Sequence, residues 1–456
     1  MTFSILLAVL VLAADPAAEL APNYANASTH GARSSNQQWW TRFADPGLND
    51  LVRQGTDNNF SVLTAESRID EADAVVAQQL APLLPTATWD TSLTTGPLDS
   101  LGFQFGGGVG GTAMTANLPE LYWQASSAVN VNLGIDITGK NVLGHRASKD
   151  DRKAAKHDVD AQRQAVASQI TAAYFDLVTA RAQLEIAKRQ VETNEQLLQL
   201  TEVKFETGNA NAVDVLQQRQ QVAASKLQVP RAEQQEKAFQ QRLAVLLGEA
   251  PGDTFDTPRT LPSLPAKPDL GAPSDLLQTR PDLRAKAERL EASEKRTKVS
   301  RRSFAPNLSL SARGGVQAIK TVGDWRDQGF WSASATLSVP LSTGGSTYAK
   351  MRQAKAQQRT ASRDLSQSTL TAVQEVEDAL IREEQQVEVL KLYEEQYEAA
   401  KSAFEESRKR YAEGVAEYLP VFTALATVQR AELDIVTAKR DLIAARIALY
   451  TALGDR

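Results

Sequence analysis

Lys204-Phe205-Glu206-Thr207-Gly208 closes one long segment with helical periodicity, and the segment after it ends at Leu246-Leu247-Gly248. The same arrangement returns as Arg410-Tyr411-Ala412-Glu413-Gly414, followed by a segment that ends at Ala452-Leu453-Gly454. One offset relates both the turn glycines and the closing glycines (414 − 208 = 206 and 454 − 248 = 206). The chain therefore contains an internal repeat, in which each copy is a helical hairpin that must bury its apolar stripe against neighbours.

Two segments with alternating apolar and polar residues precede each helical hairpin. The first pair covers 86–94 and 121–137, and the second covers 308–316 and 331–341. Alternation over this length predicts strands with one apolar and one polar face. The residues that we expect on the polar face, lining the lumen of a closed barrel, are Asp90, Gln124, Asn130, Asn132, Asp136 and Arg313.

Four strands are too few to close a membrane barrel, because the smallest stable barrels have about eight. Beyond an apolar run at the N-terminus, no segment reaches the roughly 18 to 20 apolar residues of a transmembrane helix. In a membrane, the chain would have to span as strands. Three copies would supply twelve strands and leave no open edge in the lipid. A soluble β-sandwich is the alternative interpretation of these strands.

The first long helix carries a heptad seam, in which apolar and small residues recur at alternating steps of four and three. From Lys149 to Thr207 such a helix is about 90 Å long at 1.5 Å per residue. Its return arm, from Asp214 to Leu247, is shorter, so a second stacked helix must continue it. The seam residues are Ala173, Leu177, Ala180, Leu184, Ala187, Val191, Asn194, Leu198, Thr201 and Phe205.

Composition excludes several classes of site. The 456 residues include no cysteine, which excludes disulfides, thiolate metal sites, cysteine nucleophiles and an N-terminal lipid-anchored cysteine. The 50 basic and 55 acidic residues are well mixed, so no basic face for nucleic acid is expected. Phe3 to Ala14 is an apolar run of signal-peptide length, although no Lys or Arg precedes it.

The order of the segments predicts seven parts of the chain. We expect a signal peptide at 1–14, an N-terminal segment with an equatorial helical part at 15–82, and a first β-hairpin at 83–138. A first long helical hairpin follows at 139–250, then a linker with an equatorial helix at 251–304. A second β-hairpin at 305–343 and a second long helical hairpin at 344–456 complete the repeat.

Other motifs carry little weight. Gly106, Gly108 and Gly111 match a dinucleotide fingerprint formally, but they lie between strands with no helix after them, which favours a loop. The three histidines (His30, His145 and His157) lack metal-ligand spacing, and three methionines do not support a thioether route for copper or silver. We therefore expect no catalytic residues, no metal and no cofactor.

Several signatures lie in one order along nearly the whole chain. They are Trp39-Trp40 with Phe43 and Asp45-Pro46-Gly47-Leu48, Leu84-Pro85, Arg280-Pro281-Asp282-Leu283 with Ala287-Glu288 and Leu290, Phe304-Ala305-Pro306, and the two aromatic-x-x-Gly turns. In these residues the chain resembles the outer-membrane factor family of Gram-negative bacteria, the TolC-like and OprM/NodT-type efflux channels. The resemblance implies a mixed α and β fold: a homotrimer with a 12-stranded transmembrane β-barrel, four strands per chain, continuous with a 12-helix periplasmic α-barrel of coiled coils.

The resemblance also implies a function. It is passive exit of small molecules, as in multidrug resistance, through a channel in outer-membrane lipid, driven by an inner-membrane pump of the RND type through a periplasmic adaptor. Many relatives carry a lipid-anchor motif that ends in Cys; here Asp15 stands in the Cys place, so no lipid anchor is expected. A type I protein-secretion duct and a soluble coiled-coil scaffold are the alternatives.

The resemblance places a gate at the helical turns. In the family, the tyrosine of the second turn hydrogen-bonds an acid that begins the first return helix, and Tyr411 and Asp214 occupy those positions. Tyr418 is a further candidate for the gate. Relatives often carry an acid where this chain has Pro420, which leaves Glu413 and Glu417 as candidates for a ring of carboxylates that selects cations. Solvated surface acids and simple packing of Tyr411 are the alternatives.

We also expect the turns to dock the helical hairpin of an adaptor, because their residues are small. The candidates for this docking surface are Gly208, Asn209, Ala210, Gly414, Val415 and Ala416.

Overall fold

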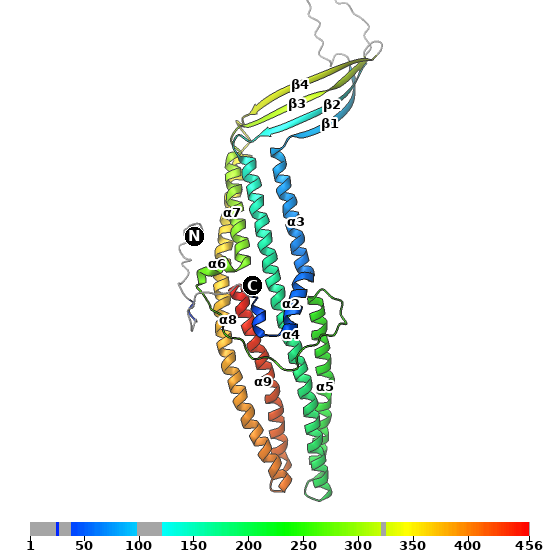
Figure 1. Cartoon of the computed structure of the whole chain (residues 1–456), viewed down its shortest axis with the longest axis vertical. Helices are drawn as coiled ribbons and strands as arrows, with labels where there is room; N and C mark the ends of the chain where they lie inside the picture. The colour runs from blue at the N-terminus through cyan, green and yellow to red at the C-terminus, as the bar shows by residue number, and fades with distance from the viewer. Residues whose placement is uncertain (1–23, 27–37, 98–120, 321–324, 456) are drawn as a thin grey trace, which may run out of the picture. The chain divides into compact units, whose positions relative to one another are not determined.

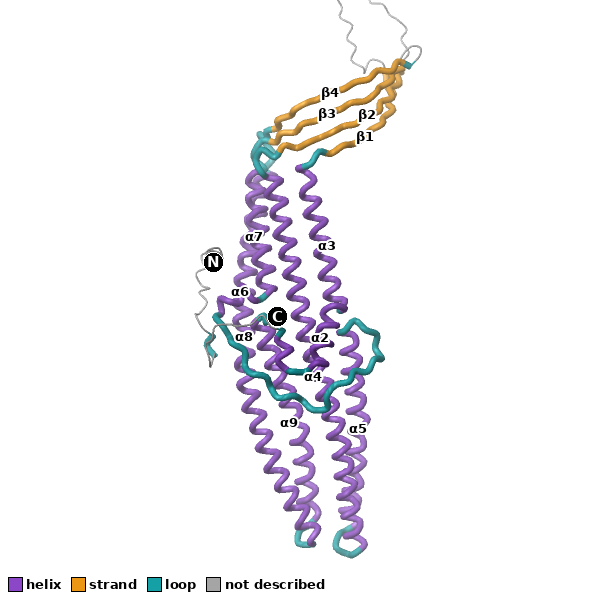
Figure 2. The backbone as a smooth tube through the Cα atoms, viewed as in Figure 1, coloured by secondary structure: helices purple, strands orange, loops and turns teal. Residues whose placement is uncertain are grey.

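The computed structural model describes residues 24–26, 38–97, 121–320 and 325–455, which form long helices and one sheet (Figures 1 and 2). The signal peptide expected at 1–14, Asp15 and the loop with Gly106, Gly108 and Gly111 lie outside the described residues. Among the described residues, the helices do not combine the length and apolar character needed to cross a membrane.

The sheet has four strands in the order β1-β2-β3-β4, each antiparallel to its neighbour. They are β1 (Thr86–Pro97), β2 (Leu121–Ile135), β3 (Asn307–Lys320) and β4 (Arg326–Ser338). The four predicted strands are confirmed. Their ends differ from the expected ranges: β2 and β4 stop earlier, at Ile135 and Ser338, whereas β1 and β3 run on to Pro97 and Lys320, and β4 begins earlier, at Arg326.

The chain divides into two compact units, one of residues 1–69, 153–287 and 362–456, the other of residues 70–152 and 288–361. The second unit contains the sheet and parts of α3 (Phe60–Leu80), α4 (Lys140–Glu206), α7 (Pro281–Arg302) and α8 (Ser346–Glu413). Polar contacts join these helices: Arg152 on α4 pairs with Asp73 on α3 at 2.8 Å, and the Thr297 hydroxyl on α7 donates to the Ala354 carbonyl on α8 at 3.2 Å.

The core of the first unit explains the tryptophan signature. Trp39, in a short 3-10 helix (Trp39–Phe43), is fully buried and stacks on Tyr450 with ring centroids 5.5 Å apart. Asp45 then caps α2 (Pro46–Asn58) by accepting from the Leu48 amide at 3.2 Å, while the Tyr174 hydroxyl donates to its other oxygen at 2.6 Å. The motif thus anchors the N-terminal helix onto α4.

The predicted heptad seam of α4 is largely buried in the structure. Ala173, Leu177 and Ala180 are at most 1% exposed, whereas Phe205, next to the turn, is 46% exposed. Two polar seam residues, Asn194 and Thr201, are fully buried. The seam therefore packs tightly in its middle and includes buried polar groups near the turn.

Each return helix ends against the start of another helix, in the same way in both copies. α5 (Ala212–Leu246) ends near Asn59, whose side-chain amide donates to the Leu246 carbonyl at 2.8 Å. α9 (Tyr418–Leu453) ends near Thr279, whose hydroxyl donates to the Leu453 carbonyl at 3.2 Å. These contacts satisfy carbonyls that a helix C-terminus leaves unpaired. A second helix, α3, thus begins where the shorter arm ends, and its continuation of that arm stays a prediction.

The linker between the copies, residues 247–272, is an irregular loop (Figure 2). Arginines of the long helices hold it in place. Arg181 on α4 donates to the carbonyls of Phe255 and Thr257 at 2.6 and 2.9 Å. Arg446 on α9 donates to the Pro265 carbonyl and makes a buried bidentate pair with Glu383 on α8 at 2.8 and 2.9 Å. The linker is thus fixed to the helices of both copies.

We predict that Gly248→Ala destabilises the protein more than Gly208→Ala. Both glycines have a left-handed backbone, with φ of +79° and +74°, and this conformation costs a residue with a Cβ about 1 to 2 kcal/mol. A Cβ on Gly248 would also lie 2.6 Å from the Asn58 carbonyl oxygen, whereas one on Gly208 would meet nothing within 4 Å. We expect losses of about 2 to 4 and about 1 kcal/mol, respectively.

Denaturant unfolding of the detergent-solubilised protein, followed by tryptophan fluorescence, measures both losses. Equal losses for the two variants would show that the contact with Asn58 does not constrain the closing glycine.

Candidate functional site at the helical turns

The two turns share one backbone geometry. After Gly208, the Asn209 amide donates back to the Lys204 carbonyl at 2.8 Å; after Gly414, the Val415 amide donates to the Arg410 carbonyl at 2.9 Å. This is the helix-ending motif in which glycine adopts the left-handed conformation. The proposed docking residues are exposed, except for Ala210 and Ala416, which are half-buried.

The return helices begin differently in the two copies. Asn211 and Asp214 form a reciprocal capping box at the start of α5: the Asp214 amide donates to the Asn211 side chain at 2.9 Å, and the Asn211 amide donates to the Asp214 carboxylate at 3.1 Å. Glu417 caps α9 without a side-chain hydrogen bond to the helix. Glu413 and Glu417 are both exposed beside the second turn.

Tyr411 and Tyr418 lie together in a buried cluster next to the turns. They are 2% and 3% exposed, and their ring centroids are 6.1 Å apart in an edge-on arrangement. The apolar neighbours in this cluster, which we call the turn cluster, are Leu197 from α4 with Val421 and Leu425 from α9. The turn cluster therefore joins the two helical hairpins close to their turns.

The hydrogen bond expected between Tyr411 and Asp214 is not formed. Within the described part of the chain, the Tyr411 hydroxyl has no hydrogen bond of normal geometry, although it lies beside Thr201. Burial raises its pKa, and the charge of Asp214 raises it further, so Asp214 acts on Tyr411 only at a distance. The Asp214 carboxylate instead lies at the start of its own helix, where it accepts from the Asn211 amide.

A different tyrosine makes the polar contact between the hairpins. The Tyr418 hydroxyl donates to the Gln218 side-chain carbonyl on α5 at 2.7 Å. The Gln218 side-chain amide in turn donates to the Asn194 carbonyl on α4 at 2.8 Å, and the Asn194 side chain donates to the Gln190 carbonyl at 2.8 Å. Gln218 and Asn194 are both 0% exposed.

Sequence reasoning missed Gln218. A signal was present, because Val215, Gln218 and Val222 step by three and four along the buried face of α5. Asn194 similarly interrupts the seam of α4. Polar residues in two facing apolar seams indicate that they bond each other, since a buried polar group without a partner costs about 1 to 3 kcal/mol.

Further contacts join α4 and α9 away from the turns. Asp176 accepts from Arg440 at 2.7 Å, Arg189 pairs with Glu432 at 2.5 Å, and Gln190 donates to the Gln429 carbonyl at 2.9 Å. As the α4 numbers rise the α9 numbers fall, so the two helices are antiparallel. Arg189 is 63% exposed, and such surface pairs contribute only about 0 to 1 kcal/mol.

The sheet places most of the expected polar residues on one face. The register aligns Thr88, Asn130, Arg313 and Ser332 in one row across the four strands. In this row the Asn130 side chain donates to the Asp90 carboxylate at 2.5 Å. The opposite face is apolar and exposed; its members include Trp89, Leu93, Trp123, Val129, Val316, Trp331 and Leu337.

Asp136 corrects the expectation for the strand. It follows the end of β2, and its carboxylate accepts from the amides of Lys140 and Val142 at 2.8 and 2.9 Å. Asp136 therefore satisfies the first amides of α4 and is not a strand residue. The alternating pattern in the sequence includes Asp136, which made it look like a strand residue. An acid is also favoured at a helix N-terminus, and that is the position of Asp136 in the structure.

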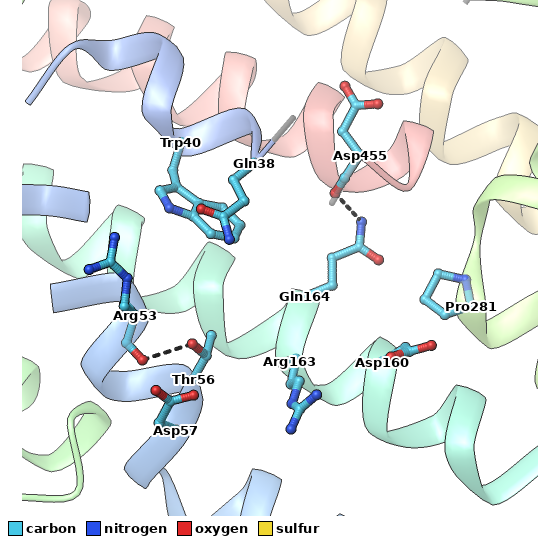
Figure 3. Close-up of a pocket in the computed structure, with 10 residues that line it drawn as sticks. All are labelled: Gln38, Trp40, Arg53, Thr56, Asp57, Asp160, Arg163, Gln164, Pro281 and Asp455. Atoms are coloured by element: carbon cyan, nitrogen blue, oxygen red, sulfur yellow. Dashed lines mark hydrogen bonds between the residues drawn. The ribbon is translucent and has the colours of Figure 1, made fainter. Parts of the chain in front are cut away.

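A cleft of about 330 Å³ lies beside α2 and α4 of the first unit (Figure 3). Its polar groups already bond neighbours: Arg163 pairs with Glu66 at 2.6 Å, and the Gln164 side chain donates to the Asp455 carbonyl at 3.1 Å. Among the described residues that line it, no nucleophile is paired with a base.

One acidic group, Asp150 with Glu288 and Glu291, has the spacing of a metal site in the described residues. Lys295 pairs with both Asp150 and Glu291, so an ammonium group already balances these carboxylates. This arrangement favours an ion-pair network over a metal centre.

The duplicated hairpins and the two-faced sheet define the class of this protein, and comparison with known proteins gives its family. The family described as outer membrane efflux protein matches residues 51–249 and 272–455, and the chain belongs to this family. The resemblance found in the sequence is therefore confirmed. The protein is an efflux channel component of the outer membrane of Gram-negative bacteria.

Individual relatives agree over almost the whole chain. The pyoverdine export outer membrane protein OpmQ of Pseudomonas aeruginosa is 27% identical over 425 residues, which cover 92% of this chain and 88% of OpmQ. Nodulation protein T of Rhizobium leguminosarum bv. viciae is 26% identical over 421 residues, 91% of this chain and 83% of that protein. The structure of the outer-membrane channel OprN matches with a TM-score of 0.83 and 26% identity, covering 96% of this chain and 97% of OprN.

Proposed function

We propose that three copies of this chain form the exit duct of a tripartite efflux pump. Each copy would contribute two β-hairpins, within 83–138 and 305–343, to a 12-stranded barrel in outer-membrane lipid. The helical hairpins, within 139–250 and 344–456, would form a 12-helix periplasmic tunnel. Small molecules would leave passively, delivered by an inner-membrane pump of the RND type and a periplasmic adaptor.

The sheet carries this proposal. One face exposes large apolar side chains, such as Trp331 at 84% and Trp89 at 77%, which a folded protein does not leave in water over a whole sheet face. The other face bears Asp90, Gln124, Asn130, Asn132 and Arg313, which suits a water-filled lumen. Twelve strands from three chains would give the unpaired edges of β1 and β4 partners.

We predict that lysine is harmful on one face of β2 and tolerated on the other. Val129→Lys would bring a charge into lipid, which costs about 2 to 4 kcal/mol near the middle of a membrane. Asn130→Lys, one residue further, would place the same charge in the lumen beside Asp90. We expect Val129→Lys to lower the amount of heat-resistant trimer in outer-membrane fractions, and Asn130→Lys to leave it unchanged. Equal effects would contradict the proposed orientation of the sheet.

The turns would form the gate of the channel. Tyr411, Tyr418 and Asp214 lie where the two hairpins meet, and we assign the closed state to contacts in the turn cluster. Glu413 and Glu417 are exposed at the second turn, so threefold symmetry would give rings of carboxylates at the periplasmic mouth.

The deciding experiment is single-channel recording of the purified protein in planar lipid bilayers. We expect small wild-type currents that increase clearly in the double variant Leu197→Ala, Val421→Ala, because both side chains are buried between the hairpins. Leu392→Ala, on an exposed part of α8, serves as the control. In the opened channel, Glu413→Gln with Glu417→Gln should reduce the preference for cations.

The outcomes separate the parts of the proposal. A wild type that conducts fully, with no change in the variant, would leave a channel whose gate is not at the turns. Well-folded protein that never inserts would favour a soluble coiled-coil scaffold instead.

The turn residues would dock the adaptor: Gly208, Asn209, Ala210, Gly414, Val415 and Ala416. We predict that Asn209→Trp with Val415→Trp removes most efflux from cells, because two large side chains would block this contact. Single-channel currents should stay normal. Glu395→Trp, an exposed position on α8 away from the turns, is the control. Unchanged efflux of a toxic dye from cells with the double variant would refute docking at the turns.

A further inference from the structure

A polar link between the two hairpins, close to their turns, is buried and uncharged. Tyr418 donates to Gln218, and Gln218 donates to Asn194, at 2.7 and 2.8 Å. All three residues are at most 3% exposed. Three helices therefore meet in one network: α9 of the second copy with α5 and α4 of the first.

We propose that Tyr418, Gln218 and Asn194 form the latch that holds the channel closed. This inference rests on the proposed function. It assigns closure of the gate to an uncharged hydrogen-bond network rather than to the pair of Tyr411 and Asp214. Tyr418 acts as a positioning residue, which fixes α9 against α5 and α4 next to the turns.

The geometry explains why this link acts as a switch. When α9 moves away from α5, the Gln218 carbonyl loses its donor while the Gln218 amide stays bound to Asn194 on α4. The hydroxyl and the carbonyl must then find water or remain unpaired, and a buried polar group without a partner is costly. Partial separation is therefore unfavourable, so the network favours either a closed or a fully wetted arrangement.

The network also keeps its donors over the physiological pH range. Burial raises the pKa of the Tyr418 phenol well above its usual value, and the nearby charge of Asp214 raises it further. The hydroxyl thus remains protonated and able to donate, while the two amide side chains of Gln218 and Asn194 do not titrate in this range.

Other links between α4 and α9 are less suited to this role. The ion pair of Arg440 with Asp176 is partly buried, but Arg440 lies in the half of α9 that is remote from the turn. Arg189 and Glu432 pair at the surface, where water and salt compete with the contact. The Gln190 side chain donates to the backbone carbonyl of Gln429 on α9. Gln429 lies farther along α9 from the turn than Tyr418 does. The Tyr418 network lies at the first residue of α9 and so next to the turn itself.

The test is single-channel recording with Tyr418→Phe, Gln218→Met and the double variant. Phe keeps the aromatic packing against Tyr411 and Phe422, so Tyr418→Phe removes only the hydroxyl. Each single variant should raise the ratio of open to closed time about tenfold, as expected for loss of one partner in a buried hydrogen bond. Because the residues act together, the double variant should also rise about tenfold and not about a hundredfold.

Tyr393→Phe on α8, which removes a hydroxyl outside the network, is the matched control and should leave the ratio unchanged. Heat resistance of the trimer, measured in parallel, separates opening from unfolding: variants that open the channel should keep the trimer intact. A rise of the open ratio only in variants that lose the trimer would overturn the latch.

Two results distinguish failure of the latch from failure of the proposed function. If Tyr418→Phe matches wild type while Leu197→Ala with Val421→Ala opens the channel, the gate stands and the latch is wrong. The same holds if Tyr411→Phe opens the channel and Tyr418→Phe does not. If folded trimer gives no current with any variant, the channel function fails and the latch fails with it.

Discussion

The unpaired edges of β1 and β4 are the constraint on which the rest of this protein depends. Among the described residues of one chain the sheet is open, and each edge strand leaves backbone amides and carbonyls without partners in the ladder. Water can satisfy these groups, but lipid cannot. The exposed tryptophans on one face favour lipid, so we interpret the sheet as one third of a closed barrel. The repeat then has a physical purpose, because each half supplies one β-hairpin with one helical hairpin.

The two halves are alike at the far ends of the return helices and differ at the turns, where we propose the gate. At the far ends of the return helices, Asn59 and Thr279 satisfy the last carbonyls of α5 and α9 in equivalent ways. At the turns, α5 begins with a closed capping box, whereas α9 begins at Tyr418 with no side-chain cap. The start of α9 therefore depends more on contacts from the other hairpin than the start of α5 does.

The periodicity of apolar residues was enough to predict the strands and the long helices. Burial of one face imposes a period of two residues on a strand and a seven-residue repeat on a long packed helix. The seam of Leu177 and Ala180 and the polar row with Asn130 follow directly. The hydrogen-bond partner of each polar side chain was harder to predict. Asp136 fits the strand pattern, yet it caps α4, and Asp214 caps its own helix instead of meeting Tyr411. A side chain with several possible partners is decided by three-dimensional proximity, which spacing in the sequence does not contain.

Magnitudes decide which contact between the hairpins can control their separation. A surface pair such as Arg189 with Glu432 contributes about 0 to 1 kcal/mol and weakens in salt, because water solvates both partners when it breaks. Breaking the buried bond of Tyr418 with Gln218 leaves polar groups unpaired, at about 1 to 3 kcal/mol, until water enters. A closed state held by such bonds is stable against changes of salt and pH, yet a partner that opens a path for water at the turns can release it.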